Sequence, residues 1–243
     1  MNESVAICLP AGSEVRTFFA YDLARMMAST ASLRPDIQMH ILVATGSLVM
    51  KQRESLAKAA LSEAGITHML WLDTDMRFPK DTLVRLLAHD TPWVCAGYIE
   101  RSAPFRPVAF LTPEDWTNRV EATPGSTGLR QIYACGFGVM LTHREMYEKM
   151  RRPWFMVGFN HELDGFLGED VYFCHQANLA GYKLMLDQDL THEVKHIGTF
   201  EFEGHHAIRA REQREAQEVR EAEAEQDARK EEHIAADMER TEA

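Results

Sequence analysis

The chain has 243 residues, 45% of them hydrophobic, and a formal net charge of −11, which suits one domain with a substantial core plus an appendage. The negative charge argues against a large non-specific nucleic-acid footprint, although a local basic groove is not excluded. No stretch is long and apolar enough to span a bilayer, and the N-terminus lacks a signal-peptide pattern, so we expect a cytoplasmic protein without a membrane span.

The first hundred residues alternate between short apolar runs and segments of helical periodicity. We predict strands over 5–10, 39–46, 68–73 and 93–100, with helices over 15–30, 47–65 and 79–90. Gly65 gives the second helix a stop signal, and Pro79 suits the first turn of the third. This β-α-β-α-β-α-β order predicts an α/β fold with a mostly parallel sheet and helices on both faces.

The second half has a different pattern. We predict strands over 105–112 and 129–142, joined by a polar hairpin or loop, then helices over 143–150 and 170–181 and one or two short strands within 182–198. Residues 204–243 are charged throughout and predict a solvated helix or a disordered tail, with the folded domain at 1–203. The tail is also a candidate oligomerisation element, but its apolar positions are too sparse for a steady heptad.

The four cysteines lie in apolar surroundings without metal-site spacing. They are Cys8, Cys95, Cys135 and Cys174. This pattern predicts reduced thiols in the core of an intracellular protein.

Two aspartates, Asp73 and Asp75, follow the apolar strand in the segment HMLWLDTDMRFPKD. In a parallel α/β sheet ligands bind at the carboxyl ends of strands, and residues i and i+2 of an extended chain point the same way. Both carboxylates would then face one Mg²⁺ or Mn²⁺ ion, which would also bind phosphate oxygens of a substrate. The alternative is helix capping, by Asp75 or more plausibly by Asp81.

A second group of polar residues lies in the segment 165–198. Glu169 and Asp170 begin a predicted helix, where the positive end of the helix dipole stabilises anions. His196 follows an apolar run and is a candidate third metal ligand, with His192 as a nearby competitor. The alternatives are favourable helix-start charge for the carboxylates and a structural role for the histidine.

Together these segments resemble the nucleotide-sugar-dependent glycosyltransferases of the GT-A fold, in particular small family-2-like enzymes. The resemblance covers roughly residues 4–203. It is carried, in the family's order, by LDTDMRFP, ACGFGVMLTHREMYEKM, FLGEDVYFCHQANLAGYKL and VKHIG. It implies a GT-A domain that moves a sugar, of hexosyltransferase type, from a nucleoside diphosphate to an acceptor hydroxyl with Mn²⁺ or Mg²⁺.

The resemblance also implies roles for individual residues. Asp73, Asp75 and His196 would hold the metal, with Asp73 also near the ribose, while Asp170 would be the general base and Glu169 would position the acceptor. The other implied donor-binding residues are Pro10, Ala11, Arg53, Arg101, Gly136 and Gly138. The two glycines would leave room for the sugar, the first two residues would line the base pocket, and the arginines would reach the base, the phosphates or, in the case of Arg101, the acceptor.

One departure from the family concerns the second strand, which ends LVATGS where many members have an aspartate for the base or ribose. Thr45, Gly46 or Ser47 would take that place. A UDP-sugar is the first choice of donor, and the acceptor is open among a glycan, a glycoprotein and a hydroxymethylated DNA base. We expect inversion at the anomeric carbon.

Two other functions compete with this interpretation. Paired aspartates at a strand end also serve metal-dependent phosphohydrolases and nucleotidyltransferases. A non-catalytic nucleotide-sugar-binding protein would retain the same fold, with the tail as its interaction element.

Overall fold

A computed structural model describes residues 3–101, 105–113, 118–160 and 164–199. The described part contains a seven-stranded sheet, whose strand order is β2 (Gln38–Thr45), β1 (Ser4–Ala11), β3 (His68–Leu72), β7 (Val139–His143), β5 (Trp93–Cys95), β10 (Leu184–Asp187) and β6 (Leu129–Ile132). Strand β1 is parallel to β2 and β3, and β10 is parallel to β5; β7 and β6 run antiparallel to their neighbours. The predicted mostly parallel sheet is confirmed.

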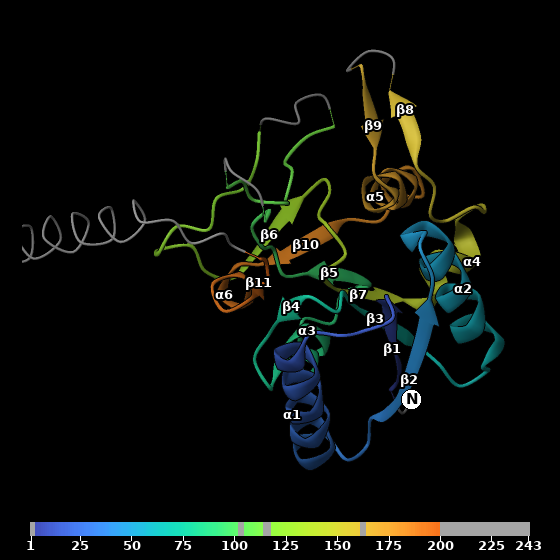
Figure 1. Cartoon of the computed structure of the whole chain (residues 1–243), viewed down its shortest axis with the longest axis vertical. Helices are drawn as coiled ribbons and strands as arrows, with labels where there is room; N and C mark the ends of the chain where they lie inside the picture. The colour runs from blue at the N-terminus through green and yellow to red at the C-terminus, as the bar shows by residue number, and fades with distance from the viewer. Residues whose placement is uncertain (1–2, 102–104, 114–117, 161–163, 200–243) are drawn as a thin grey trace, which may run out of the picture. The chain divides into compact units, whose positions relative to one another are not determined.

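Helices cover both faces of this sheet (Figure 1). One face is covered by α2 (Val49–Ser62), α4 (Arg144–Lys149) and α5 (Glu169–Leu179). The other is covered by α1 (Thr17–Leu33), α3 (Thr82–Ala88) and α6 (Gln188–Thr191). Each set packs on its own hydrophobic core, so the domain has three layers.

The alternation of side chains along β1 shows how the two cores arise. Val5, Ile7 and Leu9 face α1 and α3, while Ala6 and Cys8 face α2. All five are buried, as expected for a central strand covered on both faces. The four cysteines are also buried and unpaired, as predicted.

The second half departs from the predicted strands. Residues 105–112 make isolated bridges, such as Phe110 with Ala134, instead of a regular strand. The single strand predicted over 129–142 is two, β6 and β7, at different places in the sheet. The segment between them, from Tyr133 to Gly138, contains the two glycines against which Tyr98 packs, so close packing interrupts the strand there.

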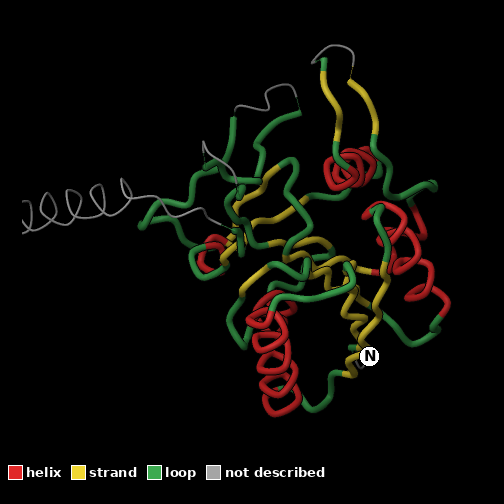
Figure 2. The backbone as a smooth tube through the Cα atoms, in the orientation of Figure 1, coloured by secondary structure: helices red, strands yellow, loops and turns green. Residues whose placement is uncertain are grey.

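Three short features were not predicted. The hairpin β8 (Gly158–Asn160) and β9 (Gly165–Leu167) projects beside α5 (Figure 2). Helix α6 lies inside the segment for which only strands were predicted. Strand β4 (Met76–Arg77) pairs with β11 (Lys195–His196) in a separate two-stranded sheet.

The described domain falls within one compact unit, Met1–Gly198. The predicted tail, 204–243, lies outside the described residues. Among the described helices, none has the length and apolar character needed to cross a membrane.

Candidate functional site

The candidate site lies where β3 ends. Asp73 follows the strand, its amide donates to the carbonyl of Gly138 at 3.1 Å, and the amide of Met76 donates back to the Asp73 carbonyl at 3.1 Å. The chain therefore turns between Asp73 and Asp75 instead of staying extended. Alternation along a strand holds only while the strand continues, so it does not relate the directions of these two carboxylates, and each has a different partner in this structure.

The Asp73 carboxylate faces Arg53 of α2. The Nη2 atom of Arg53 donates to Asp73 Oδ1 at 2.8 Å and to Oδ2 at 3.1 Å, and Nη1 donates to Glu169 Oε1 at 2.6 Å. The Arg53 side chain is only 4% exposed. It was predicted to reach the base or diphosphate, but the structure places it beneath the carboxylates, joined to both.

Asp75 faces a different set of partners. Its Oδ2 atom lies 2.7 Å from Arg101 Nη1 and 3.4 Å from His196 Nε2. His196 reaches this position because β11 pairs with β4 and the Ile197 amide donates to the Asp75 carbonyl at 2.7 Å. Burial alone would raise the pKa of Asp75, but His196 and Arg101 hold it below its ordinary value.

The His196 ring is held by its other nitrogen. Nδ1 lies 2.9 Å from the carbonyl oxygen of Ile99, which can only accept a hydrogen bond, so Nδ1 is the donor of this contact. Nε2 faces the Asp75 carboxylate, 3.4 Å from Oδ2. Histidines that bind metals usually have this arrangement, with one nitrogen donating to an acceptor and the other free for the ion.

Asp75 and His196 therefore fit a divalent cation. Adjacent ligands of six-coordinate Mg²⁺ lie about 3 Å apart, and the two facing atoms are 3.4 Å apart. The third predicted ligand, Asp73, is turned to Arg53, and within the described residues no three His, Cys, Asp or Glu side chains form a metal-binding group. The remaining coordination positions would go to water and substrate oxygens, as Mg²⁺ prefers.

Asp170 lies in the first turn of α5. Its Oδ1 atom accepts from the Val171 amide at 2.8 Å, and its Oδ2 atom has no hydrogen-bond partner among the described residues. A Cβ atom on Gly168 would lie 2.5 Å from Oδ1, so that glycine allows the carboxylate its position. Burial raises the pKa of the Asp170 carboxyl, and the charge of Arg53 opposes this rise.

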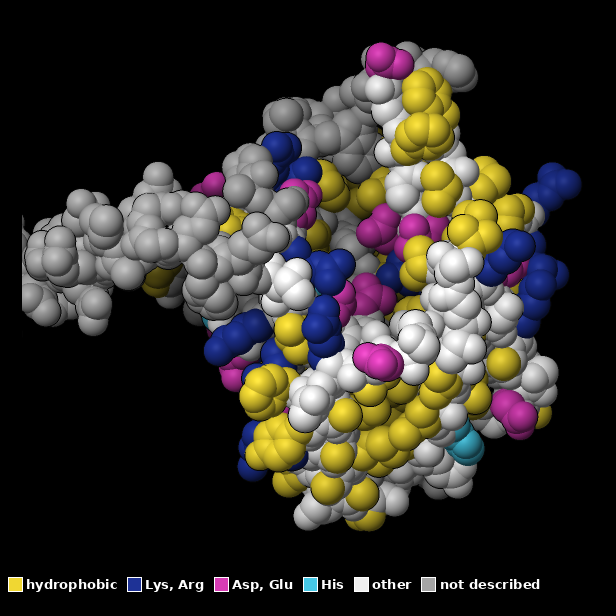
Figure 3. All heavy atoms as spheres, viewed as in Figure 1, with side chains coloured by type: hydrophobic (Ala, Val, Ile, Leu, Met, Phe, Trp, Pro, Cys, Tyr) yellow, Lys and Arg dark blue, Asp and Glu magenta, His cyan; other side chains and the backbone are white. Residues whose placement is uncertain are grey.

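Glu169, the neighbour of Asp170, also has a pKa raised by burial and lowered in part by Arg53. Its side chain points to Arg53, whereas Asp170 Oδ1 accepts from the Val171 amide. The two carboxylates of this helix start thus have different surroundings. Figure 3 shows acidic and basic side chains gathered around a hollow in the middle of the visible face.

Tyr98 was not identified from the sequence. A methyl group on Gly136 would overlap its hydroxyl, and one on Gly138 would lie 2.6 Å from its Cε1 atom. The glycines predicted to make room for a sugar therefore make room for this ring. Tyr98 also packs edge-on against His196, with ring centroids 5.0 Å apart, and burial and the nearby Asp73 carboxylate raise the pKa of its hydroxyl.

A polar cavity of about 370 Å³ opens beside Asp75. It is lined by Thr74, Arg101 and the loop after β1, residues 12–16. The predicted base-pocket residues Pro10 and Ala11 are themselves buried, and the carbonyl of Ala11 accepts from Gln52 Nε2 at 2.7 Å. The loop that follows them lines the cavity. Its polar sequence GSEVR, directly after a strand, could have identified it as a binding loop from the sequence.

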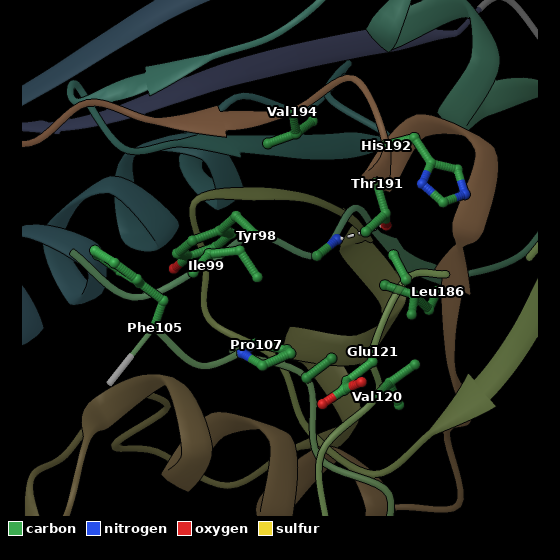
Figure 4. A pocket seen from close by; sticks show the side chains of 13 residues that line it. Tyr98, Ile99, Phe105, Pro107, Val120, Glu121, Leu186, Thr191, His192 and Val194 are labelled. Carbon is green, nitrogen blue, oxygen red and sulfur yellow. Dashed lines mark hydrogen bonds between the residues drawn. The ribbon is translucent and has the colours of Figure 1, made fainter. Parts of the chain in front are cut away.

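A second cavity, of about 390 Å³, lies next to Tyr98 and Ile99 (Figure 4). Its walls are mostly apolar, with Phe105, Val120 and Leu186 among them. Tyr98 and Ile99 thus line this cavity and also contact His196.

The structure also locates the residues on which the alternative interpretations depend. His192 lines the second cavity, with Nε2 3.0 Å from the Ser126 carbonyl oxygen, and is not beside Asp75. Asp81 occupies the N-cap position of α3, but its side chain makes no capping hydrogen bond. Asp75 caps no described helix, so helix capping does not account for the aspartate pair.

No protein-family model and no curated protein matches the chain. Among solved structures it is similar to GalNAc-T7, crystallised with UDP, GalNAc and Mn²⁺, at 14% identity and a TM-score of 0.51 over 82% of this chain and 44% of that one. It is also similar to A197 from STIV (17% identity, TM-score 0.48, 83% of this chain and 97% of that one). A third similar structure is S. aureus TarS 1-349 in complex with UDP-GlcNAc (12% identity, TM-score 0.45, 83% and 60%).

The chain spans less than half the length of GalNAc-T7. At this identity the likeness is one of fold alone. It agrees with the sheet order and the two helical layers described above, and the chain has the GT-A fold predicted from its sequence.

Proposed function

We propose that the protein is a divalent-metal-dependent glycosyltransferase that moves a sugar from a nucleoside diphosphate to an acceptor hydroxyl. The observation that carries the proposal is the pair formed by Asp75 and His196. The His196 imidazole is held by the contact between Nδ1 and the Ile99 carbonyl oxygen. Its Nε2 atom faces the Asp75 carboxylate at the carboxyl end of β3. The fold supports the proposal, because GalNAc-T7 has been crystallised with UDP, GalNAc and Mn²⁺.

The donor would bind in the polar cavity beside Asp75. Arg101 is 48% exposed and lines this cavity together with Arg16, so both can bind phosphate oxygens. A bound Mn²⁺ or Mg²⁺ would neutralise charge that develops on the leaving diphosphate. Asp75 and His196 would hold that ion, and Asp73 would remain close to the ribose.

Asp170 would act as the general base. Its Oδ2 atom has no partner among the described residues, whereas Oδ1 is held by the Val171 amide. A carboxylate fixed through one oxygen can accept the proton of the attacking hydroxyl with the other. Direct attack by that hydroxyl inverts the anomeric configuration, and inversion is the expected outcome.

A UDP-hexose is the first donor to test, because GalNAc-T7 binds UDP. The acceptor candidates are a glycan, a protein and a hydroxymethylated DNA base. The two arms of a turnover assay would be sugar-nucleotide hydrolysis without acceptor and transfer with each acceptor class.

The test of the metal site is UDP binding, measured by calorimetry with and without Mn²⁺. We expect Mn²⁺ to strengthen UDP binding. Asp75→Asn or His196→Ala should weaken the UDP affinity in the presence of Mn²⁺ by more than about tenfold. Asp36→Asn, which changes an exposed aspartate paired with Arg34, is the matched control and should leave the affinity unchanged.

Three results would contradict the proposal. If UDP and UDP-sugars bind equally with and without Mn²⁺ in all four proteins, Asp75 and His196 do not hold a metal for the donor. If phosphate is released from phosphoesters and no sugar is transferred, the protein is a phosphohydrolase instead. Metal-dependent binding without turnover of any donor would indicate a nucleotide-sugar-binding protein.

A further inference from the structure

Arg53 connects two segments of the site that are far apart in the sequence. It projects from α2, and its guanidinium lies between the end of β3 and the first turn of α5. One nitrogen, Nη2, donates to both oxygens of Asp73, and the other, Nη1, donates to Glu169. One guanidinium thus joins two carboxylates through charge-assisted hydrogen bonds, which are stronger than neutral ones.

Arg53 is less accessible to a donor than Arg101 is. Its side chain is 4% exposed, and its guanidinium carbon lies 5.0 Å from the centroid of the Phe137 ring. Both terminal nitrogens are already bonded to carboxylates. Arg101, by contrast, is 48% exposed and lines the polar cavity, so it is the arginine placed to meet a phosphate.

The charges around Arg53 explain why a cation is needed there. Asp73, Glu169 and Asp170 all act electrostatically on the guanidinium. Like charges this close in a partly buried region repel strongly unless a counter-charge lies among them. Removing Arg53 would leave those carboxylates uncompensated, the situation in which a broken buried ion pair is most damaging.

We propose that Arg53 is a positioning residue that holds the first turn of α5 at a fixed distance from the end of β3. Its bonds to Asp73 anchor it at the end of β3, and through Glu169 it would place the neighbouring Asp170. The catalytic part of this inference rests on the proposed function. The structural part, that Arg53 fixes the position of the first turn of α5, does not depend on the proposed function.

The first experiment compares Arg53→Lys with Arg144→Lys in the full-length protein. Lysine keeps the charge but has no planar fork, so it cannot hold both carboxylates in the same way. Arg144 is a suitable control, because its side chain binds the backbone carbonyls of Leu61, Glu63 and Ile66 away from the site. The measurements are thermal unfolding, UDP–Mn²⁺ affinity, kcat and donor KM for sugar-nucleotide turnover, and amide hydrogen exchange of Val171 and Tyr172.

For Arg53→Lys we expect kcat to fall more than about tenfold, as misplaced groups cost large factors in rate, with donor KM and UDP–Mn²⁺ affinity changed less than about threefold. Exchange at Val171 and Tyr172 should accelerate. Arg144→Lys should lower thermal stability only. A raised donor KM with kcat intact would instead make Arg53 a donor contact, and a loss of stability alone would make it merely structural; either result overturns the proposal.

If Arg53→Lys does not fold, variants with an uncharged residue at position 53 test the positioning role instead. Arg53→Met alone leaves two carboxylates without their partner, whereas Arg53→Met with Asp73→Asn and Glu169→Gln removes those charges too. We expect fast exchange in the α5 first turn for both variants, because neither keeps the guanidinium that joins Asp73 to Glu169; slow exchange in the triple variant would show that Arg53 only offsets charge. Equal, slow exchange in both would refute the positioning role.

The same measurements separate this inference from the proposed function. If the wild-type protein turns over no sugar nucleotide, the proposed function fails, and the exchange rates still decide whether Arg53 positions α5. If the wild type is active but Arg53→Lys matches the Arg144→Lys control in every measurement, the proposed function stands and the positioning role fails.

Discussion

The two oxygens of Asp170 have different surroundings, and this difference has a consequence for pH. Only Oδ1 has a partner among the described residues, and burial raises the pKa of the carboxyl against the opposing charge of Arg53. A base must be ionised to accept a proton, so transfer should be active above this pKa and lost as the pH falls through it. We expect the acid limb of kcat/KM above the pH at which an ordinary aspartate titrates.

Asp170→Asn tests the same role directly. The amide cannot accept the proton, so transfer should slow by about 10²- to 10⁴-fold, the range for loss of a general base. UDP–Mn²⁺ affinity should change little, because Asp75 and His196 would hold the metal. Loss of donor binding in Asp170→Asn, with none in His196→Ala, would show that the donor and base clusters are assigned the wrong way round.

Gly136 and Tyr98 form a second pair that can be tested at the scale of single residues. A Cβ atom at Gly136 would overlap the Tyr98 hydroxyl, and overpacking of this kind costs about 1–3 kcal/mol. We expect Gly136→Ala to lower the free energy of unfolding in urea by that amount, with a smaller loss when Tyr98 is already alanine. Gly65→Ala, with no atom within 4 Å of its added Cβ, is the control; additive effects of Gly136→Ala and Tyr98→Ala would contradict the packing.

The sequence predicted which carboxylates gather at the site but not how they face. Asp73 and Asp75 are near one another, as a pair after a strand must be, yet the strand ends at Leu72 and the turn directs them to different cations. Arg53 was identified as functional, but its partners come from β3 and α5. Tyr98 had no signal of its own, because an aromatic residue after an apolar strand is most often simply part of a core.

At the scale of elements, the late histidine reaches Asp75 through the pairing of β4 and β11. Each of these strands has two residues, which is too short for an alternating pattern to appear in the sequence. The longer strands and helices of the first half were predictable because their periodicity extends over several residues. The short pair instead depends on tertiary contacts, chiefly the hydrogen bond from the Ile197 amide to the Asp75 carbonyl.

Ile197→Pro removes that hydrogen bond, since proline has no amide hydrogen. We expect Mn²⁺-dependent UDP affinity to fall by at least about threefold, while the free energy of unfolding drops by about 1 kcal/mol, the usual net value of one hydrogen bond. Ile197→Ala keeps the amide and is the matched control. If both variants bind UDP–Mn²⁺ like the wild type, the pairing of β4 with β11 does not position His196.

At the scale of the whole molecule, the alternation of strands and helices was enough to predict a three-layer domain. The two cores follow from β1, where successive apolar side chains enter opposite faces. The order of the strands across the sheet could not be read in the same way, because β7 joins between β3 and β5 from a distant part of the chain. That insertion is what brings Gly138 to the amide of Asp73 and Tyr98 to the glycines.

The division of the chain leads to a prediction about the segment 204–243. The candidate site residues and both cores fall within Met1–Gly198, one compact unit, so a chain that ends after residue 203 should retain them all. We expect this shortened protein to unfold in one transition at the temperature of the full chain and to bind UDP–Mn²⁺ with unchanged affinity. If the charged segment mediates oligomerisation, light scattering will show a smaller mass per particle than loss of the segment alone explains. Loss of UDP–Mn²⁺ binding in the shortened chain would show that the segment belongs to the site and that the domain boundary is wrong.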